Sequence, residues 1–361
     1  MQTEYRHILQ KLELLKPSEY AKNRNYIDGD VSKLSPYISR GVISTKQVFE
    51  YVLSLDYPFY KIEKFVQELA WRDYWQQIWI NKGTLINYDL KNKQEGVKNY
   101  LIPKAIIEGK TSIKAVDDSI ADFYESGYIH NHVRMYIASL CCNIGRCHWK
   151  LPAKWMYYHL LDADWASNAL SWQWVCGSNS NKLYFANQDN INKYCHTNQK
   201  NSFIDIEYHQ FNDLKIPSEL SELKDLKLTS SLPKITNKII TYSDKPTLIY
   251  NFYNLDPQWK KNIDANRILL IEPSVFENYP ISNKSMEFMI ELSKNIKNIQ
   301  IYVGEFKQLN EIIDKSDIYY KEHPLNSNYK GNKDKRDWMF PVDGNFSSFF
   351  KYWKTCKKYI K

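Results

Sequence analysis

Hydrophobic residues return every three or four positions along the first two hundred residues, which is the period of an α-helix. The stretches "YKIEKFVQELAWRDYWQQIWI" and "NHVRMYIASLCCNIGR" show this period clearly. Ser44 stands at the N-cap position before "TKQVFEYVLSL", and Gly127 ends the pattern of "IKAVDDSIADFYES". We therefore expect helices from the N-terminus to about residue 200.

The pattern changes after residue 200. Residues 200–235 are polar and interrupted by prolines, and they predict a linker. From residue 236 onward, the short β-rich runs "TLIYNFY", "RILLIEP" and "IQIYVGEF" alternate with the helical pattern "NKSMEFMIELSKNI". Strands and helices in alternation predict a small α/β domain with a partly parallel sheet. The tail "WMFPVDGNFSSFFKYWKTCKKYIK" predicts an aromatic-rich helix that docks back onto the body.

The predicted fold class is therefore mainly α, with two domains. A helical domain takes residues 1–205, a linker takes 206–235, and a small α/β domain of unassigned role takes 236–361.

Composition narrows the class of protein. The 361 residues carry a formal charge of +8, which favours an anionic partner such as nucleic acid. The N-terminus has no apolar segment of a secretory signal, and no run of about 18 apolar residues occurs, so we expect a cytoplasmic protein. No GxGxxG or P-loop motif is present. The six cysteines contain no CxxC pair, which favours reduced buried thiols over an iron–sulfur site, and we expect no metal.

One predicted helix carries an unusual polar face. In "KFVQELAWRDYW", Glu68, Trp71, Arg72 and Trp75 share one face because they are spaced at i, i+3, i+4 and i+7. An acid, a cation and two indoles are costly to bury unless each polar group has a partner. The face is either a ligand site or an amphipathic surface with an intrahelical Glu68–Arg72 pair.

Two further segments combine polar groups with helical pattern. Asn131, Arg134 and Met135 share a face in "HNHVRMYIASL", which indicates a ligand contact or a pair between Arg134 and a structural carboxylate. In "GDVSKLSPYISRG" the residues before Pro36 are extended or turned. Their hydroxyls and backbone N–H groups form an anion cradle, or Ser35 is a plain N-cap.

The stretch "LLDADWASNALSWQW" places Asp162, Asp164 and Asn168 before two tryptophans, Trp172 and Trp174. A hydrophobic core does not require this mixture. The indoles are either core residues or members of an electron path to a redox cofactor, and Trp149 in "CHWKLP" belongs to the same question.

Four motifs occur together and in order: "SKLSPYISRGVIS", "ELAWRDYW", "IHNHVRM" and "DADWASNALSWQW". With them, residues 20–194 resemble the helical flavin-binding domain of the photolyase/cryptochrome family. The resemblance implies a U-shaped FAD as cofactor. By position it assigns FAD contacts to the following residues: Tyr20, Ser32, Lys33, Leu34, Ser35, Glu68, Arg72, Asn131, Arg134, Asp162, Asp164 and Asn168.

The resemblance also implies individual roles. Tyr20 and residues 32–35 match the contacts to the phosphates and ribityl chain, and Glu68, Arg72 and Asn131 match the flavin and active-site boundary. Arg134 and Asp162 match an ion pair beside the isoalloxazine, Asp164 contacts the ring edge, and Asn168 faces flavin N5.

A relay of tryptophans is implied as well. Trp172 and Trp149 match the first two members of the chain that carries electrons to the flavin. The third would fall near Gly96, where no indole stands; Tyr100 lies nearby without an assigned role.

Within the family the motifs agree best with photolyases that act on cyclobutane pyrimidine dimers. The residues that match the lesion-contacting set are Glu68, Trp71, Asn131, Met135 and Trp174. Enzymes of the (6-4) type carry histidines at Asn131 and Met135, and plant-type cryptochromes usually carry Asp at Asn168, so both are disfavoured. The implied activity is a carbon–carbon lyase reaction, a light-driven electron transfer that splits the dimer in DNA. The alternatives are a blue-light photoreceptor that signals without repair, and a flavoprotein without a light-dependent role.

The sequence also departs from the family. An α/β antenna domain normally precedes the flavin domain, whereas here an α/β segment follows it, either as a relocated antenna-like module or as an unrelated one. Family arginines are replaced by Ala121, His132 and Ala186, and a common tryptophan by Tyr128. Fewer arginines predict weaker phosphate contacts. We expect damaged DNA as the partner, no membrane association and a monomer.

Overall fold

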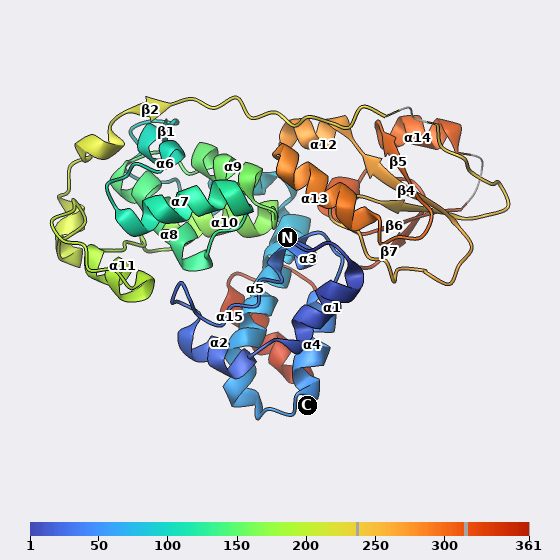
Figure 1. Cartoon of the computed structure of the whole chain (residues 1–361), viewed down its shortest axis with the longest axis horizontal. Coiled ribbons are helices and arrows are strands. Elements are labelled where there is room, and N and C mark those ends of the chain that lie inside the picture. Colours follow the sequence, from blue (N-terminus) through green and yellow to red (C-terminus); the bar gives the residue numbers. More distant parts are fainter. Residues whose placement is uncertain (236–237, 314–316, 361) are drawn as a thin grey trace. The chain divides into compact units, whose positions relative to one another are not determined.

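The computed structural model describes residues 1–235, 238–313 and 317–360 (Figure 1). The chain divides into two compact units. Unit 1 combines residues 1–17, 32–81 and 229–361, and unit 2 combines residues 18–31 and 82–228. Each unit is described by itself.

These units differ from the predicted segments 1–205 and 236–361. The switch from helical to strand pattern near residue 236 marks a change of secondary structure, whereas compact units are defined by packing. Residues 1–17 and 32–81 pack with the C-terminal part of the chain, so unit 1 contains helices from the N-terminal motifs as well as the sheet.

Unit 2 is helical, as the period predicts. Its α-helices, π-helical turn and strands are α2 (Pro17–Asn23), β1 (Ile102–Pro103), α6 (Lys104–Glu108), α7 (Lys114–Ser126), α8 (Asn131–Ser139), the π-helical turn Leu140–Ile144, α9 (Lys150–His159), α10 (Trp165–Val175), α11 (Gln188–Cys195) and β2 (Leu223–Lys224). Pro17, the first residue of α2, belongs to unit 1. β1 and β2 form a two-stranded antiparallel ribbon.

The predicted end of α7 is confirmed. Gly127 follows the helix with φ of 68°, in the left-handed region that glycine adopts without steric cost. A Cβ at this position would lie 2.7 Å from Leu161 Cγ, so the close approach of the next loop also requires glycine.

The helices of unit 1 are α1 (Tyr5–Glu13), α3 (Ser35–Ser39), α4 (Thr45–Ser54), α5 (Phe59–Lys82), α12 (Pro273–Asn278), α13 (Asn283–Ser293), α14 (Phe306–Ile312) and α15 (Phe349–Cys356). Ser44 caps α4 as predicted: its Oγ accepts a hydrogen bond from Gln47 N at 3.0 Å, and Gln47 Oε1 accepts one from Ser44 N at 2.9 Å.

The sheet of unit 1 is parallel throughout. Its strands are β3 (Thr247–Tyr250), β4 (Asn266–Ile271), β5 (Ile299–Val303), β6 (Ile318–Lys321) and β7 (Asn332–Asp334), in the order β5-β4-β3-β6-β7. The sequence predicted a partly parallel sheet; every pairing among these five strands is parallel. β3 and β4 are buried along their whole length, which explains why they appear in the sequence as continuous apolar runs rather than as an alternation.

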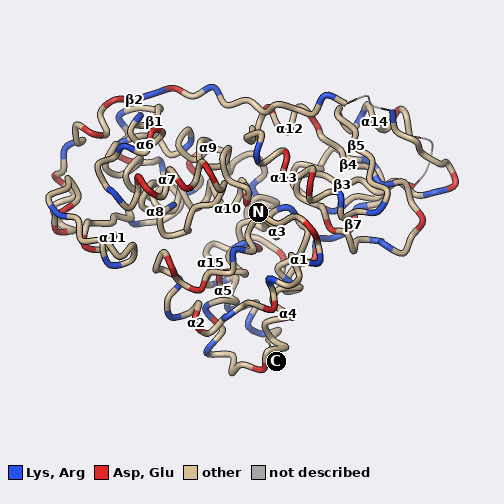
Figure 2. Tube along the Cα trace, in the orientation of Figure 1, with Lys and Arg blue, Asp and Glu red and all other residues tan. Residues whose placement is uncertain are grey.

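One hydrophobic cluster holds α14 against the sheet. It joins Ile249, Ile268 and Leu270 of the strands to Phe306 and Leu309 of the helix. Basic and acidic positions are interspersed along most of the trace of both units (Figure 2), whereas the sequence of residues 344–361 contains lysines and no acidic residue.

Candidate functional site

The turn that precedes α3 adopts a strained conformation. Lys33 has φ of 51°, in the left-handed region that costs a non-glycine residue about 1–2 kcal/mol. Ser32 Oγ accepts a hydrogen bond from Leu34 N at 3.3 Å, and Leu34 is fully buried. Ser35 is the first helical residue and Leu34 the N-cap, without a side-chain cap, so the alternative that Ser35 is an N-cap is wrong. The turn exposes Lys33 beside two hydroxyl side chains, as an anion-binding turn requires.

The charged side chains on the polar face of α5 have partners on the same helix and on α3. Glu68 forms an ion pair with Lys64 at 3.2 Å, one turn earlier on the same helix. Arg72 Nη1 donates to Ser39 Oγ of α3 at 2.7 Å, which links the face to the motif that contains the turn. Both side chains are half-buried, so their charged ends reach the surface of unit 1.

Trp71 is stacked by a residue from the far end of the chain. The ring of Phe349 lies parallel to it, with centroids 3.7 Å apart and 10° between the planes. Trp75 lies at 4.9 Å and Tyr74 at 5.7 Å from the same indole. One face of the predicted lesion-contacting indole is therefore covered within unit 1.

The C-terminal helix is fixed along α5 at more than this point (Figure 1). Trp353 Nε1 donates to Glu63 Oε1 at 3.2 Å, and Lys357 Nζ lies 3.4 Å from the same oxygen. Before α15, Phe346 O accepts from the hydroxyl of Tyr74. The predicted docking of an aromatic C-terminal helix is confirmed, with α5 as its partner.

In unit 2, the predicted ion pair is present. Arg134 of α8 donates through Nη2 to both carboxylate oxygens of Asp162, at 3.1 and 3.0 Å, and through Nε to Ile129 O at 3.0 Å. Asp162 is buried, and the loop between α9 and α10 holds it. On the same helix Asn131 is exposed and Met135 is half-buried, so the face that these three residues share reaches the surface.

The start of α10 is organised by Asp164. Its Oδ1 accepts a hydrogen bond from Ser167 N at 2.7 Å, which makes Asp164 the N-cap. Asn168 Nδ2 donates to Ala153 O of α9 at 2.8 Å and so has a fixed orientation. Ser167 Oγ is buried and has no hydrogen-bond partner in the described part of the chain. An unsatisfied buried hydroxyl costs about 1–3 kcal/mol, and a bound polar heterocycle would remove that cost.

The two tryptophans of α10 have opposite environments. Trp172 is 2% exposed, whereas Trp174 is 41% exposed and lies 6.1 Å from the ring of Tyr184. A helix turns about 100° per residue, so positions two apart face nearly opposite directions. The structure thus separates a buried indole from a surface indole.

Trp149 is fully buried, and its Nε1 donates to Asp89 Oδ1 at 2.7 Å. The ring of His148 lies 5.7 Å from it, and Tyr100 stacks on His148 at 5.0 Å and is exposed. Burial lowers the pKa of His148, which favours the neutral ring, although Asp89 opposes the effect. Sequence reasoning did not assign Tyr100, because no local pattern connects it with His148.

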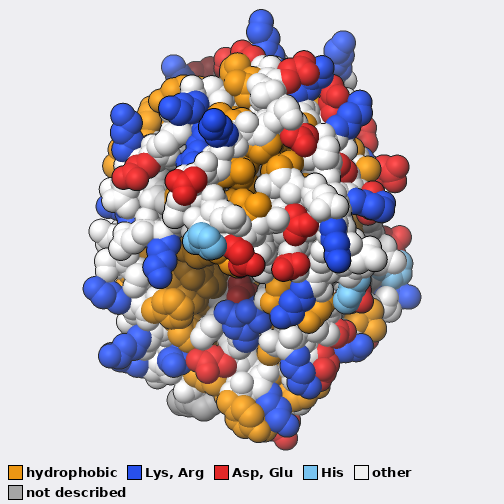
Figure 3. All heavy atoms as spheres, turned by 90° about the vertical axis from the view of Figure 1, so that its left-hand side faces the viewer, with side chains coloured by type: hydrophobic (Ala, Val, Ile, Leu, Met, Phe, Trp, Pro, Cys, Tyr) orange, Lys and Arg blue, Asp and Glu red, His pale blue; other side chains and the backbone are white. Residues whose placement is uncertain are grey.

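A cavity of about 630 Å³ adjoins this aromatic group. Its lining residues are Asn87, Tyr88, Asp89, Tyr100, His148, Lys150, Leu151 and Lys154. Figure 3 shows the face at the left of Figure 1, on which acidic and basic side chains are interspersed with hydrophobic ones.

The remaining sequence features have simple environments. Tyr20 lies half-buried in α2. His132, in place of a family arginine, forms a hydrogen bond with Asn25 O through Nδ1 at 3.0 Å, and burial lowers its pKa.

The six cysteines are free, and five of them are buried. Among the described residues no group of three or more His, Cys, Asp or Glu side chains could hold a metal ion. A search of the same residues for a helix long and apolar enough to cross a membrane found none.

Comparison with known proteins gives the helical segment a family. Residues 65–212 match the model of the FAD binding domain of DNA photolyase. The segment is a flavin-binding domain of the photolyase/cryptochrome type, as its motifs predicted, and FAD is the cofactor of that domain.

The relatives include photolyases and cryptochromes. The chain is 29% identical over 182 residues to the deoxyribodipyrimidine photo-lyase of Alkalihalophilus pseudofirmus, over 47% of this chain and 37% of that protein. It is 28% identical over 188 residues to cryptochrome-1 of Arabidopsis thaliana, over 48% of this chain and 27% of that protein. A solved bacterial class III photolyase from Agrobacterium tumefaciens aligns with 28% identity and a TM-score of 0.44, over 48% of this chain and 38% of that chain. The match therefore spans well under half the length of each relative.

Proposed function

We propose that this protein repairs cyclobutane pyrimidine dimers in DNA in a light-dependent reaction. The observation that carries the proposal is the contrast between Trp172 and Trp174, one buried and one exposed on the same helix. A relay residue must be shielded from solvent, whereas a residue that stacks on a flipped lesion must be accessible. Of the other members of the lesion set, Glu68, Asn131 and Met135 also reach the surface of their units, and Trp71 is half-buried.

Hydrogen bonds of the assigned side chains support the proposed contacts to FAD. Arg134 and Asp162 would lie beside the ring as a fixed pair, Asp164 and Ser167 would offer polar atoms to its edge, and Asn168 would present its amide. By the resemblance, the turn at residues 32–35 would contact the phosphates. When bound in its reduced form and excited by blue light, FAD would supply the single electron that splits the dimer and would take that electron back afterwards.

Aromatic side chains would contribute binding energy when the damaged bases leave the DNA helix. Extruding a damaged base pair costs a few kcal/mol, and stacking on an aromatic side chain returns about 1–3 kcal/mol per base. Trp174 provides an accessible indole for this purpose. Trp172 and Trp149 are buried and would carry electrons inward, with Asp89 holding the indole of Trp149 in place.

One observation favours a second function, a blue-light photoreceptor that does not repair DNA. Phe349 covers a face of Trp71, the other indole of the lesion set. If that face is unavailable, a lesion loses one of its two stacking partners, and the chain would use its flavin only to sense light.

One experiment separates the two functions. The purified protein with reduced FAD is mixed with an oligonucleotide that contains a thymine dimer and illuminated with blue light, with a dark sample and an undamaged oligonucleotide as controls. Repair predicts light-dependent recovery of absorbance at the thymine band. Normal flavin photoreduction without loss of dimers would refute repair and support the photoreceptor. Trp174→Ala should weaken dimer binding and leave photoreduction intact.

A further inference from the structure

The sheet of unit 1 has a switch point in its strand order. In β5-β4-β3-β6-β7, the chain moves from β3 outward to β5 and then returns to place β6 on the other side of β3. The connections that leave β3 and β6 at their carboxyl ends therefore diverge. In open parallel sheets ligands bind in the crevice that forms at this position.

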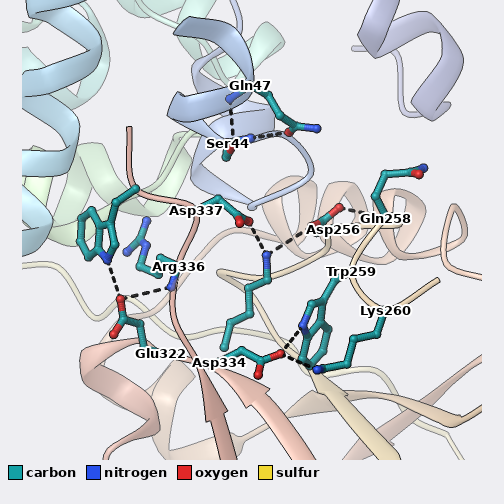
Figure 4. A network of polar contacts seen from close by, with 12 residues as sticks. Ser44, Gln47, Asp256, Gln258, Trp259, Lys260, Glu322, Asp334, Arg336 and Asp337 are labelled. Atoms are coloured by element: carbon teal, nitrogen blue, oxygen red, sulfur yellow. Dashed lines mark hydrogen bonds and ion pairs between the residues drawn. The ribbon is translucent and has the colours of Figure 1, made fainter. Parts of the chain in front are cut away.

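A cavity of about 50 Å³ lies at this position within unit 1. Its lining includes Asn254, which follows β3, His323, which follows β6, and Arg336, which follows β7. Asp73 of α5 lines it as well. Of the lining residues, Figure 4 labels Ser44, Asp256, Glu322, Arg336 and Asp337.

Two buried side chains of the lining each have one nitrogen atom without a hydrogen-bond partner among the described residues. Asn254 is 5% exposed and His323 is 8% exposed, and neither Asn254 Nδ2 nor His323 Nε2 has a partner among the described residues. His323 Nδ1 accepts a hydrogen bond from Leu325 N at 3.3 Å, so in the neutral ring the proton resides on Nε2. Both unpartnered atoms are therefore donors, and each costs about 1–3 kcal/mol while unsatisfied.

The acids of the cavity are already occupied by donors of the protein. Asp73 accepts from the hydroxyl of Thr45 at 2.9 Å and from Met339 N at 3.0 Å. Lys321 lies between Asp256, at 3.2 Å, and Asp337, at 2.5 Å (Figure 4). The cavity thus contains satisfied carboxylates and unsatisfied donors.

Glu322 is occupied as well. It accepts from Trp338 Nε1 at 2.6 Å and from the backbone N of Arg336 at 3.1 Å (Figure 4).

The guanidinium groups of Arg336 and Arg40 both act on His323. The guanidinium of Arg336 makes one side-chain hydrogen bond within the described residues, to Gln76 Oε1 at 2.6 Å, and has five N–H groups to donate. Burial, together with the positive charges of Arg336 and Arg40, lowers the pKa of His323 well below its ordinary value. The lowered pKa favours the neutral ring, and the two guanidinium groups offset part of the negative charge of the carboxylates that line the cavity.

We propose that the cavity binds a small carboxylate, held by His323 Nε2, Asn254 Nδ2 and the guanidinium of Arg336. A buried water needs about 10–15 Å³ of such space, so the volume has room for about four waters or one acetate-sized group. The two buried unpartnered atoms of the lining, among the described residues, are donors, and a guanidinium pairs with a carboxylate through parallel hydrogen bonds. Phosphates are a poorer match, because neither β3 nor β6 leads into an α-helix whose N-terminus could hold them. The proposal is independent of the repair function.

Three probes of equal size and shape test the charge of the ligand. Acetate, acetamide and acetamidinium are titrated into the full-length protein at constant ionic strength, and binding is followed by calorimetry and ligand-observed NMR. We expect acetate to bind at least tenfold more tightly than acetamide, and acetamidinium not to bind. Equal affinities, or tighter binding of acetamidinium, would overturn the proposal.

Two variants test the site. His323→Phe retains a ring to stack on Tyr253, at 4.0 Å in the native protein, and Asn254→Leu retains the volume of the side chain. Each should weaken acetate binding at least tenfold, whereas Lys307→Gln, which removes an exposed charge outside the lining, should not. Unchanged affinity in both variants would overturn the proposal. If a variant does not fold, crystals of the native protein soaked in acetate provide the test. Electron density for water alone in the cavity would contradict the proposal.

Discussion

The stack of Phe349 on Trp71 connects the C-terminal helix to a predicted DNA contact, and replacing Phe349 by leucine tests it. Phe349 is 2% exposed, and burying such a side chain fully is worth about 1.5–3 kcal/mol. The parallel stack adds about 0.5–1.5 kcal/mol beyond the buried area. Leucine keeps much of the burial and loses the stack, so we expect Phe349→Leu to lower the free energy of unfolding of unit 1 by about 1–2 kcal/mol.

The assay is urea unfolding followed by circular dichroism and by tryptophan fluorescence, to which Trp71 contributes together with the other tryptophans of the chain. The matched control is Phe350→Leu, the next residue on the same helix, which is 69% exposed and should change stability by less than about 0.5 kcal/mol. A double-mutant cycle with Trp71→Leu should give a coupling energy of about 0.5–1.5 kcal/mol.

A coupling energy near zero would refute this reasoning, as would an equal loss of stability in Phe349→Leu and Phe350→Leu. The same variant bears on function. A flipped base gains about as much from stacking as Phe349 does, so the two would compete for one face of Trp71. Tighter binding of dimer-containing DNA by Phe349→Leu would show that the lesion uses this face.

Three further changes have defined outcomes. Trp172→Phe should abolish rapid photoreduction in transient absorption while FAD stays bound, and Trp174→Phe should not; equal effects would contradict the separation of the two indoles. Asp162→Asn should lower the free energy of unfolding in urea by about 2–4 kcal/mol, because Arg134 loses the carboxylate that accepts two of its hydrogen bonds, and a change below about 0.5 kcal/mol would contradict a fixed ion pair. His323 is neutral in the folded protein and binds a proton in the unfolded state below its ordinary pKa of about 6.5, so it makes stability fall with decreasing pH by up to about 1.4 kcal/mol per unit. His323→Phe should lose this slope between pH 6.5 and 5 in urea titrations, and an identical slope in both proteins would show that the ring is protonated when folded.

The sequence by itself determined the local features of this protein. Helix α4 begins after Ser44 and α7 ends at Gly127 because a cap and a left-handed turn depend on residues within one helical turn. The motifs around Arg134 and Asp162 predicted an ion pair, which the structure contains. The alternation of strands and helices after residue 236 predicted the α/β region, because burial on both faces of a sheet leaves a pattern in the chain itself.

The tertiary structure alone decided which distant residues meet. Phe349 on Trp71, and Tyr100 on His148, join positions with no shared period, so no local pattern could indicate them. The order of the strands, and with it the cavity beside His323, depends on which strands pair across long connections. The grouping of residues 32–81 with the sheet has the same origin. Hydrophobic patterns specify that a face is buried, and only the packed chain specifies what buries it.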